Sequence, residues 1–259
     1  MDVGGNKIQR TNILGVGVSS INMGQAIETI QGWIDNREPH YVCVTPAHSI
    51  MECYNDPALR PIFNHSGLTT PDGMSIVWLL KLNGHRHVER VYGPDLMHAV
   101  CKHSLNHGYR HYFYGGTPGV VEDLETTLKE QYPGLKVVGS YSPPFGALDK
   151  EEEDQITDHI KTANPDILWV GISSPRQEIW MAEHLSTLNV PVLIGVGAAF
   201  DFLSGRKPQA PKWMQRSGLE WLFRLTNEPG RLWRRYLRYP LFLFLVIAQL
   251  LGLKKYTLE

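Results

Sequence analysis

The sequence of 259 residues predicts an α/β fold, in which helices cover both faces of a parallel sheet. Two observations support this prediction. Short apolar runs that are typical of buried strands alternate with segments of helical length, and glycine-rich turns follow several of these runs. Hydrophobic residues make up 42% of the chain and charged residues 20%, which indicates a globular protein and not a disordered one.

The first half of the chain contains strands and short helices in sequence. Residues 11–20 predict a strand and a turn, 23–33 predict a helix with apolar residues at helical spacing, and 41–45 predict a buried strand. Two short helices, a strand ending in a turn, and a further helix are expected next, over 49–54, 57–64, 68–73 and 74–82.

The second half alternates more regularly. Four strands are expected over 111–114, 135–139, 167–171 and 190–196, with helices between them over 120–131, 151–163 and 177–185. Strands separated by helices of about 10–15 residues are typical of a Rossmann-like parallel sheet. Ligands of such sheets bind at the carboxyl ends of the strands. We therefore expect the site in the loops after residues 45, 71, 114, 171 and 196.

Two of these loops are rich in glycine. Gly115 and Gly116 precede a predicted helix, whose N-terminus offers free N–H groups and a positive dipole end to an anion. Gly197 follows the last strand, and Asp201 comes soon after it, where its carboxylate is suited to accept hydrogen bonds from a ribose or a base. Ordinary tight turns, with Asp201 as a surface acid, are the alternative.

Two loops carry candidate charged groups. Asp72 follows a strand in a Thr-Pro-Asp-Gly turn, where it is placed to act as a general base towards a substrate hydroxyl, although Asp-Gly is also a common turn pair. Arg90 is a candidate clamp for a carboxylate or phosphate, and the alternative is a salt bridge to Asp95 that stabilises the loop.

The loop after residue 171 brings polar side chains to a helix start. Ser174, Arg176 and Gln177 are candidate donors to phosphate or sugar oxygens. The alternative is helix capping, with Ser174 as the N-cap and Gln177 closing a capping box.

The last fifth of the chain differs from the rest in charge. Residues 206–259 hold eleven basic and three acidic residues, whereas the preceding 205 hold fourteen basic and 23 acidic residues. The apolar run 240–253 would reach only about 21 Å as a helix, less than the roughly 30 Å of a bilayer core. We expect 1–205 to form the core and 206–259 a helical appendage on an anionic membrane surface. A buried helix or a homo-oligomer contact is the alternative.

Several functional classes are disfavoured. The histidines form no HExxH motif and the carboxylates no DxD motif, so no metal site is predicted. The absence of a Gly-x-Ser-x-Gly elbow argues against an α/β-hydrolase. No nucleic-acid partner is expected, because the arginines of the tail are interleaved with tryptophan and leucine and lead into an apolar run.

Taken together, these motifs resemble the WecG/TagA/CpsF family, glycosyltransferase family 26. The matching residues occur in consistent order over roughly residues 12–250: Thr45, 71–73, Arg90, Gly93, Asp95, 114–116, 174–178, 195–197, 200–201, 210–211, 218–225, 228–229 and 231–236. One departure is that many members have asparagine two residues after the threonine, where this chain has Ala47 followed by His48.

The resemblance implies an inverting, metal-independent bacterial glycosyltransferase. Its donor would be a UDP-sugar of N-acetylmannosamine, uronic acid or hexose type, and its acceptor a polyprenyl-diphosphate-linked sugar used in cell-surface polysaccharide synthesis. No cofactor is expected, since the UDP-sugar is a substrate. The protein would lie as a peripheral, monotopic protein on the cytoplasmic face of the inner membrane. A non-catalytic, nucleotide-binding membrane adaptor is the alternative function.

The resemblance also implies roles for individual residues. Asp72 would be the general base, Thr45 would help to position substrate, and Arg224, Arg231 and Arg234 would extend from the appendage over the active site. The expected substrate-binding residues are Arg90, Gly115, Gly116, Gln177, Glu178, Gly197 and Asp201.

Overall fold

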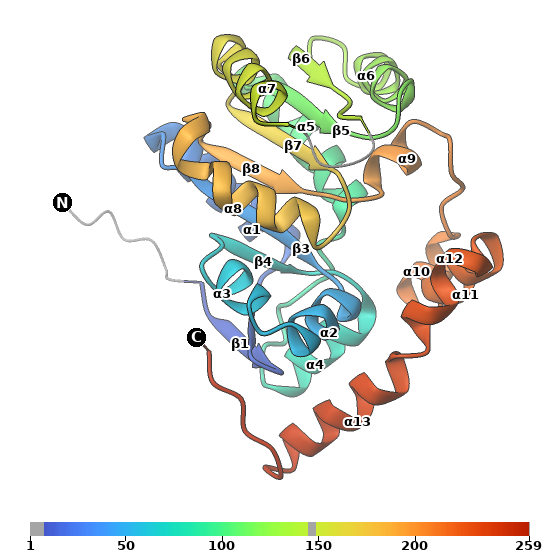
Figure 1. The fold of residues 1–259 in the computed structure, drawn as a ribbon. Coiled ribbons are helices and arrows are strands. Elements are labelled where there is room, and N and C mark those ends of the chain that lie inside the picture. Colours follow the sequence, from blue (N-terminus) through green and yellow to red (C-terminus); the bar gives the residue numbers. More distant parts are fainter. Residues whose placement is uncertain (1–7, 145–148, 259) are drawn as a thin grey trace.

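A computed structural model describes residues 8–144 and 149–258 and contains a six-stranded, fully parallel sheet with strand order β4-β3-β8-β7-β5-β6 (Figure 1). The strands are β3 (His40–Thr45), β4 (Leu68–Pro71), β5 (Arg110–Gly115), β6 (Lys136–Tyr141), β7 (Ile167–Gly171) and β8 (Val192–Gly195). The predicted parallel sheet is confirmed. The strand and turn predicted at residues 11–20 form a separate antiparallel hairpin of β1 (Arg10–Ile13) and β2 (Val16–Ser19).

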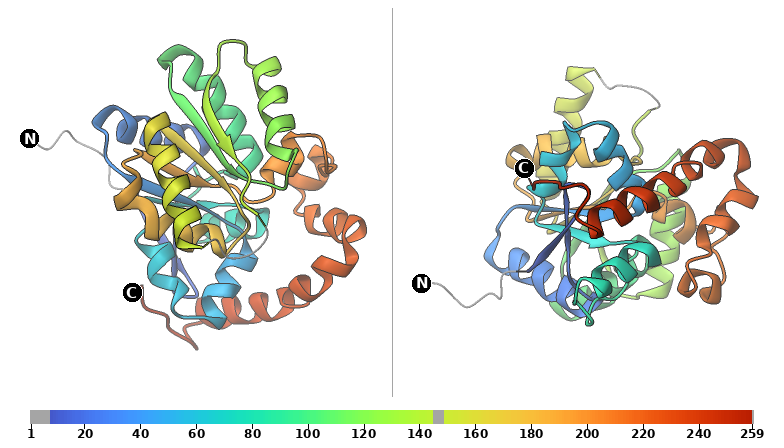
Figure 2. Two further views of the ribbon diagram at one scale, coloured as in Figure 1. Left: turned by 45° about the horizontal axis from the view of Figure 1, so that its top comes forward. Right: turned by 90° about the horizontal axis from the view of Figure 1, so that it is seen from below.

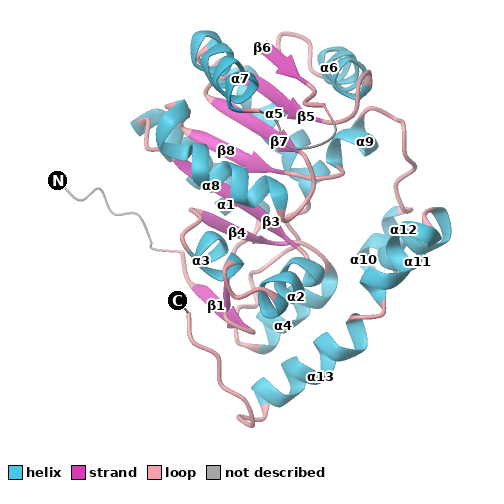
Figure 3. Ribbon diagram, viewed as in Figure 1, coloured by secondary structure: helices cyan, strands magenta, loops and turns pink. Residues whose placement is uncertain are grey.

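Helices cover both faces of the sheet, which confirms the predicted fold class (Figure 3). One group packs together around α1 (Met23–Asn36), α5 (Gly93–His107), α6 (Val120–Gln131) and α9 (Ala199–Leu203). The second group consists of α2 (Ala47–Asn55), α3 (Leu59–Asn64), α4 (Met74–Leu82), α7 (Lys150–Ala163) and α8 (Arg176–Leu188).

Side chains of the strands pack against both groups of helices. Along β5, Tyr112 and Tyr114 enter the cluster formed with α8, whereas Phe113 enters the cluster formed with α5 and α6. Successive side chains of a strand point to opposite faces, so an apolar run without alternation requires cover on both sides. This arrangement leaves the carboxyl ends of the strands open for a site.

The appendage consists of α10 (Lys212–Arg216), α11 (Glu220–Asn227), α12 (Pro229–Tyr236) and α13 (Tyr239–Leu250). In both views of Figure 2 this orange-to-red segment curves around the core. Helix α13 carries apolar residues on both sides: Phe242 and Leu245 are buried in the core cluster, while Phe244 and Ile247 are exposed. Among the described residues, no helix has both the length and the apolar character that crossing a membrane requires.

The end of the chain is tied to the β1–β2 hairpin. The backbone N–H of Leu14 donates to the side-chain oxygen of Gln249 at 2.9 Å, and the Gln249 amide donates to the Asn12 carbonyl at 2.8 Å. The Asn12 amide in turn donates to the Tyr256 carbonyl at 2.7 Å. The appendage is therefore attached to the core at both of its ends.

Candidate active site

Two cavities lie at the carboxyl ends of the strands. The large cavity, of about 580 Å³, is formed by the ends of β5 and β7, the loop after β8 and the start of α8. The small cavity, of about 80 Å³, is formed by the ends of β3 and β4 together with α11 and α12. Ser173, Gly197, Ala198 and Arg231 line both cavities, so the two lie next to each other.

The predicted glycine turn contributes to the large cavity through one of its two glycines. Gly116 lines the cavity, with φ +72°, and its N–H donates to the Gly171 carbonyl at 3.1 Å. Gly115 does not line it; a Cβ at Gly115 would lie 2.5 Å from the Gly171 carbonyl carbon. Gly115 therefore allows the close approach of the β5 and β7 ends, which is a structural role, and its predicted substrate contact stays a prediction.

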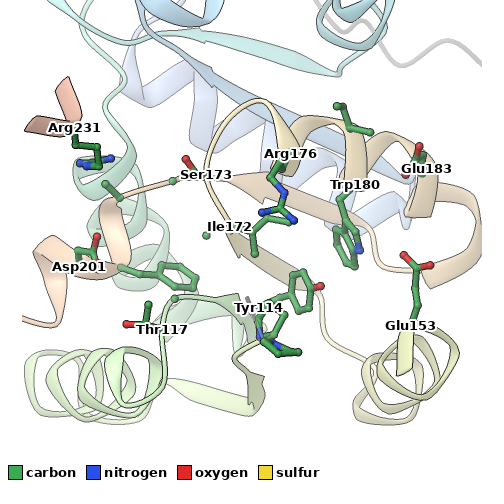
Figure 4. A pocket seen from close by; sticks show the side chains of 18 residues that line it. Tyr114, Thr117, Glu153, Ile172, Ser173, Arg176, Trp180, Glu183, Asp201 and Arg231 are labelled. Atoms are coloured by element: carbon green, nitrogen blue, oxygen red, sulfur yellow. The ribbon is translucent and has the colours of Figure 1, made fainter. Parts of the chain in front are cut away.

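One side of the large cavity is aromatic (Figure 4). The Trp180 ring stacks on Tyr114 with 4.4 Å between ring centroids and lies the same distance from His184. Its indole N–H is buried without a hydrogen-bond partner among the described residues. Arg176 lines the same side. Tyr114 and Trp180 are themselves nearly buried, so they present mainly ring edges to the cavity, and the Arg176 guanidinium beside them suits an anionic group.

The opposite side of the large cavity carries Asp201 and Arg231 (Figure 4). Asp201 is held by Lys207, whose ammonium lies 2.8 Å from the carboxylate. Lys207 also lies 3.5 Å from Glu228, and Glu228 pairs with Arg231. The predicted Asp201 thus faces the cavity, and a chain of charged groups connects it to the appendage.

Asp72 lies in the small cavity and is part of a buried ion-pair network. The guanidinium of Arg90 donates to the same oxygen of Asp72 at 3.2 and 3.1 Å, and it also donates to Glu220 of α11 at 2.6 Å. Burial raises the pKa of Asp72 above its usual range, while the charge of Arg90 opposes this rise. A carboxylate with raised basicity in a cavity suits proton abstraction.

Arg90 acts on Asp72 and does not line either cavity. Its guanidinium lies 3.9 Å from the centre of the Tyr92 ring and is 13% exposed. Arg90 is therefore placed to hold Asp72, and the prediction that it binds substrate stays a prediction. The alternative pairing with Asp95 is also wrong, because Asp95 pairs with Lys212 at 3.2 Å.

Three arginines of the appendage face the small cavity: Arg224, Arg231 and Arg235. Arg234 lines neither cavity; it is exposed and lies over the Trp233 ring at 5.3 Å. Residues four apart share one face of a helix, so Arg231 and Arg235 point inward together, whereas Arg234 points outward. Arg224 and Arg231 thus line the small cavity and Arg234 does not, while the catalytic roles expected for these three arginines stay predictions.

Thr45 and Glu178 are fully buried and line neither cavity. The Thr45 hydroxyl donates to the carbonyl of Cys43 in its own strand at 2.9 Å, and its carbonyl accepts from the Asp72 N–H at 3.3 Å. Thr45 therefore supports the backbone at Asp72, and its predicted contact with substrate is not available in this arrangement.

Glu178 supports Gln177, which lines the small cavity. The Gln177 amide donates to Glu178 at 2.9 Å, and its carbonyl oxygen accepts from the Gly197 N–H at 3.0 Å. Burial raises the pKa of Glu178 to about 7. Glu178 therefore lies behind Gln177, which lines the cavity with Gly197, and the predicted substrate contact of Glu178 stays a prediction. The alternative capping role is wrong, since α8 begins at Arg176 without a side-chain cap.

The sequence-based interpretation missed three residues around Asp72: Arg235, Glu220 and His48. Arg235 was detectable from its spacing, since it lies four residues after Arg231. Glu220 carries no local signal, because its partner Arg90 is 130 residues away in the chain. His48 lines the small cavity and directly follows Ala47, the position where many family members have asparagine. No group of three or more metal-ligating side chains occurs within residues 8–144 and 149–258.

Known proteins resemble this chain over most of its length. The family described as Glycosyl transferase WecG/TagA/CpsF matches residues 11–256. Three similar proteins carry the name N-acetylglucosaminyldiphosphoundecaprenol N-acetyl-beta-D-mannosaminyltransferase. That of Bacillus spizizenii W23 is 26% identical over 83% of this chain and 81% of its own length. That of Bacillus subtilis 168 is 27% identical over 88% and 90%, and that of Staphylococcus aureus MW2 is 25% identical over 95% of both chains.

Proposed function

The chain belongs to the WecG/TagA/CpsF family of glycosyl transferases, and we propose that it transfers a sugar from a UDP-sugar to a polyprenyl-diphosphate-linked sugar. The observation that supports this most directly is the arrangement of Asp72 and three inward-facing arginines in a small cavity beside a larger one. The names of the similar proteins support an acceptor of the N-acetylglucosaminyl-diphosphoundecaprenol type.

In this proposal UDP occupies the large cavity. Its uracil would stack near Tyr114 and Trp180 or bind at Asp201, and its diphosphate would lie near Gly116 and Arg231, at the side shared with the small cavity. The positive end of the α6 dipole, which follows this turn, and the Arg231 guanidinium suit a diphosphate. The sugar attached to this diphosphate would then enter the small cavity.

Asp72 acts as the general base for the reaction. It takes the proton of the acceptor hydroxyl as that oxygen attacks the anomeric carbon, and the bond from this carbon to the UDP oxygen breaks, so that the configuration inverts. The bonding electrons leave with UDP as negative charge on its terminal phosphate. Arg224, Arg231 and Arg235 are placed to stabilise this charge, which supports a mechanism that needs no divalent metal ion.

The exposed face of the appendage would lie on the membrane that carries the acceptor, at the cytoplasmic side. On α13 and just beyond it, Phe244, Ile247, Leu251 and Leu253 are each more than half exposed. Helix α13 has 12 residues and so spans about 18 Å, too short to cross a bilayer but suited to lie in its interface. Basic residues near such a surface contribute about 1 kcal/mol each on anionic lipid.

The test is the release of UDP from a panel of donors in the presence of N-acetylglucosaminyl-diphosphoundecaprenol in detergent. UDP-N-acetylmannosamine, UDP-N-acetylmannosaminuronic acid, UDP-N-acetylglucosamine and UDP-glucose form the panel. The proposal expects acceptor-dependent UDP release with at least one donor and a disaccharide lipid as product. Binding of UDP without turnover of any donor would contradict it and favour the nucleotide-binding adaptor.

A further inference from the structure

We propose that His48 binds a hydroxyl group of the transferred sugar beside Asp72, an inference that rests on the proposed function. His48 is the second residue of α2, directly after the end of β3, and it lines the small cavity. The same cavity is lined by Asp72 from the end of β4 and by Arg224 and Arg235 from the appendage. An imidazole therefore stands within the compartment that holds the base and the leaving-group arginines.

No described side chain or backbone group uses the hydrogen-bonding capacity of the His48 ring. Among the described residues its ring makes no hydrogen bond, whereas other enclosed histidines do. His111 accepts from the Trp169 indole at 2.9 Å, and the ring of His98 lies 3.0 Å from the Tyr132 hydroxyl. His48 is half-buried at the cavity wall, so its ring nitrogens are available to a hydroxyl group of a ligand in the cavity.

The surroundings of His48 keep its ring neutral. Burial lowers the pKa of His48 well below its usual range, and the positive charges of Arg235 and Arg224 lower it further. A neutral imidazole has one N–H donor and one acceptor nitrogen. A sugar hydroxyl also donates and accepts one hydrogen bond each, so the two groups are complementary. The arginines offer only donors and suit phosphate oxygens better.

The position of the small cavity next to the large one indicates that the transferred sugar is the group that contacts His48. A nucleotide in the large cavity projects its sugar past Ser173 and Gly197, which line both cavities, towards Asp72 and His48. The residue before His48 does not supply a polar group, since Ala47 is buried and presents only a methyl group. Ser49 also lines the cavity, but it is fully buried and its hydroxyl lies 3.4 Å from that of Ser174, whereas the His48 ring has no such partner among the described residues.

The experiment compares His48→Ala and His48→Gln with the unmodified protein. It uses the fastest donor of the panel above and the 2-, 3-, 4- and 6-deoxy analogues of its sugar. His48→Ala is expected to lower kcat/KM for the normal donor by about tenfold, the effect of one hydrogen bond near the reaction centre. His48→Gln should recover part of this loss, because an amide also donates and accepts. His65→Gln, at an exposed histidine at the end of α3, is the matched control.

The deciding measurement is whether the loss of kcat/KM caused by His48→Ala and the loss caused by removing one sugar hydroxyl are additive. One deoxy analogue should be a poor donor for the unmodified protein, yet His48→Ala should use it as well as the normal donor. The affinity for UDP itself, measured by calorimetry, should stay within about twofold in both variants.

Three outcomes would overturn the proposal. Equal losses in His48→Ala for all deoxy analogues would show that His48 contacts no sugar hydroxyl. A rise in KM for the lipid acceptor alone would assign His48 to the acceptor sugar instead. If the unmodified protein neither bound UDP nor turned over any donor, the proposed function would fail and the inference with it, which distinguishes that failure from the other two.

Discussion

The two cavities differ in which part of the chain builds them. Except for Arg231, the large cavity is lined by residues before position 205, whereas the small cavity depends on Arg224, Arg231 and Arg235 of the appendage. If UDP binds in the large cavity and chemistry occurs in the small one, binding and turnover are separable. Substitutions in the small cavity should then act on kcat, and those in the large cavity on donor affinity.

The largest expected effect is that of Asp72→Asn. Loss of the general base should lower kcat by about 10²–10⁴-fold, while the affinity for UDP changes little, because Asp72 lies in the small cavity. Steady-state UDP release and calorimetry measure the two quantities. Asp158→Asn, on the exposed side of α7, is the control. A kcat within tenfold of the unmodified protein would remove Asp72 from the role of base.

The arginines of the appendage provide the second test. Arg224→Gln and Arg235→Gln should each lower kcat by about 10- to 100-fold, because a hydrogen bond to a charged group contributes roughly 1.5–3 kcal/mol. Arg234→Gln should leave kcat in detergent within about twofold, since Arg234 faces away from the cavity. If Arg234→Gln were as harmful as Arg235→Gln, α12 would be oriented differently in the working enzyme.

The third test measures how the buried Glu178, which supports Gln177, changes the stability of the protein with pH. Its pKa lies at about 7 in the folded protein, above the ordinary 4.5, so between these values the folded state binds more protons than the unfolded chain. The free energy of unfolding should therefore fall as the pH rises from 4.5 through 7, by on the order of 3 kcal/mol from this group.

Urea unfolding of the unmodified protein and of Glu178→Gln between pH 5 and 8 measures this contribution. Glutamine does not titrate, so the difference in unfolding free energy between the two proteins should decrease as the pH rises. Glu130→Gln, on the exposed side of α6, is the matched control. A difference that is independent of pH would show that Glu178 titrates alike in both states.

The smallest effect is expected in the large cavity. Asp201→Asn should raise the donor KM by about five- to tenfold, the loss of one charge-assisted hydrogen bond, and should leave kcat nearly unchanged. Asp123→Asn, which removes an exposed partner of Arg206 outside the cavity, is the control. A fall in kcat without a rise in KM would show that the two cavities do not act separately.

Sequence reasoning located the parts of the site that follow directly from strand ends. Asp72, Gly116, Gln177, Gly197 and Asp201 were found because parallel strands bring their carboxyl ends to one edge. It did not show that the side chains of Thr45 and Glu178, whose residue types suit chemistry, are buried. Position along the chain does not reveal on which side of a strand end a side chain lies.

The appendage was less predictable than the core. Its charge and apolar run indicated a surface helix, yet three residues of α13, Phe242, Leu245 and Val246, are buried against the core. The sequence contains Arg234 and Arg235 side by side, and only the orientation of α12 decides which of them faces Asp72. Pro229 and the turn at residues 237–238 divide this segment into short helices. Short helices contain too few turns for the sequence to show which side of each faces the core.

The sequence by itself determined the layered α/β architecture. Apolar strands without alternation must be covered on both faces, and the helices that connect parallel strands provide this cover. The sequence also determined which loops meet at the open edge. Only the tertiary structure decided that Arg90 pairs with both Asp72 and Glu220, that Arg235 and not Arg234 lines the small cavity, and that His48 lines the same cavity as Asp72. Those contacts depend on how the appendage packs against the core, and packing angles between distant segments are set by side-chain complementarity that no local pattern records.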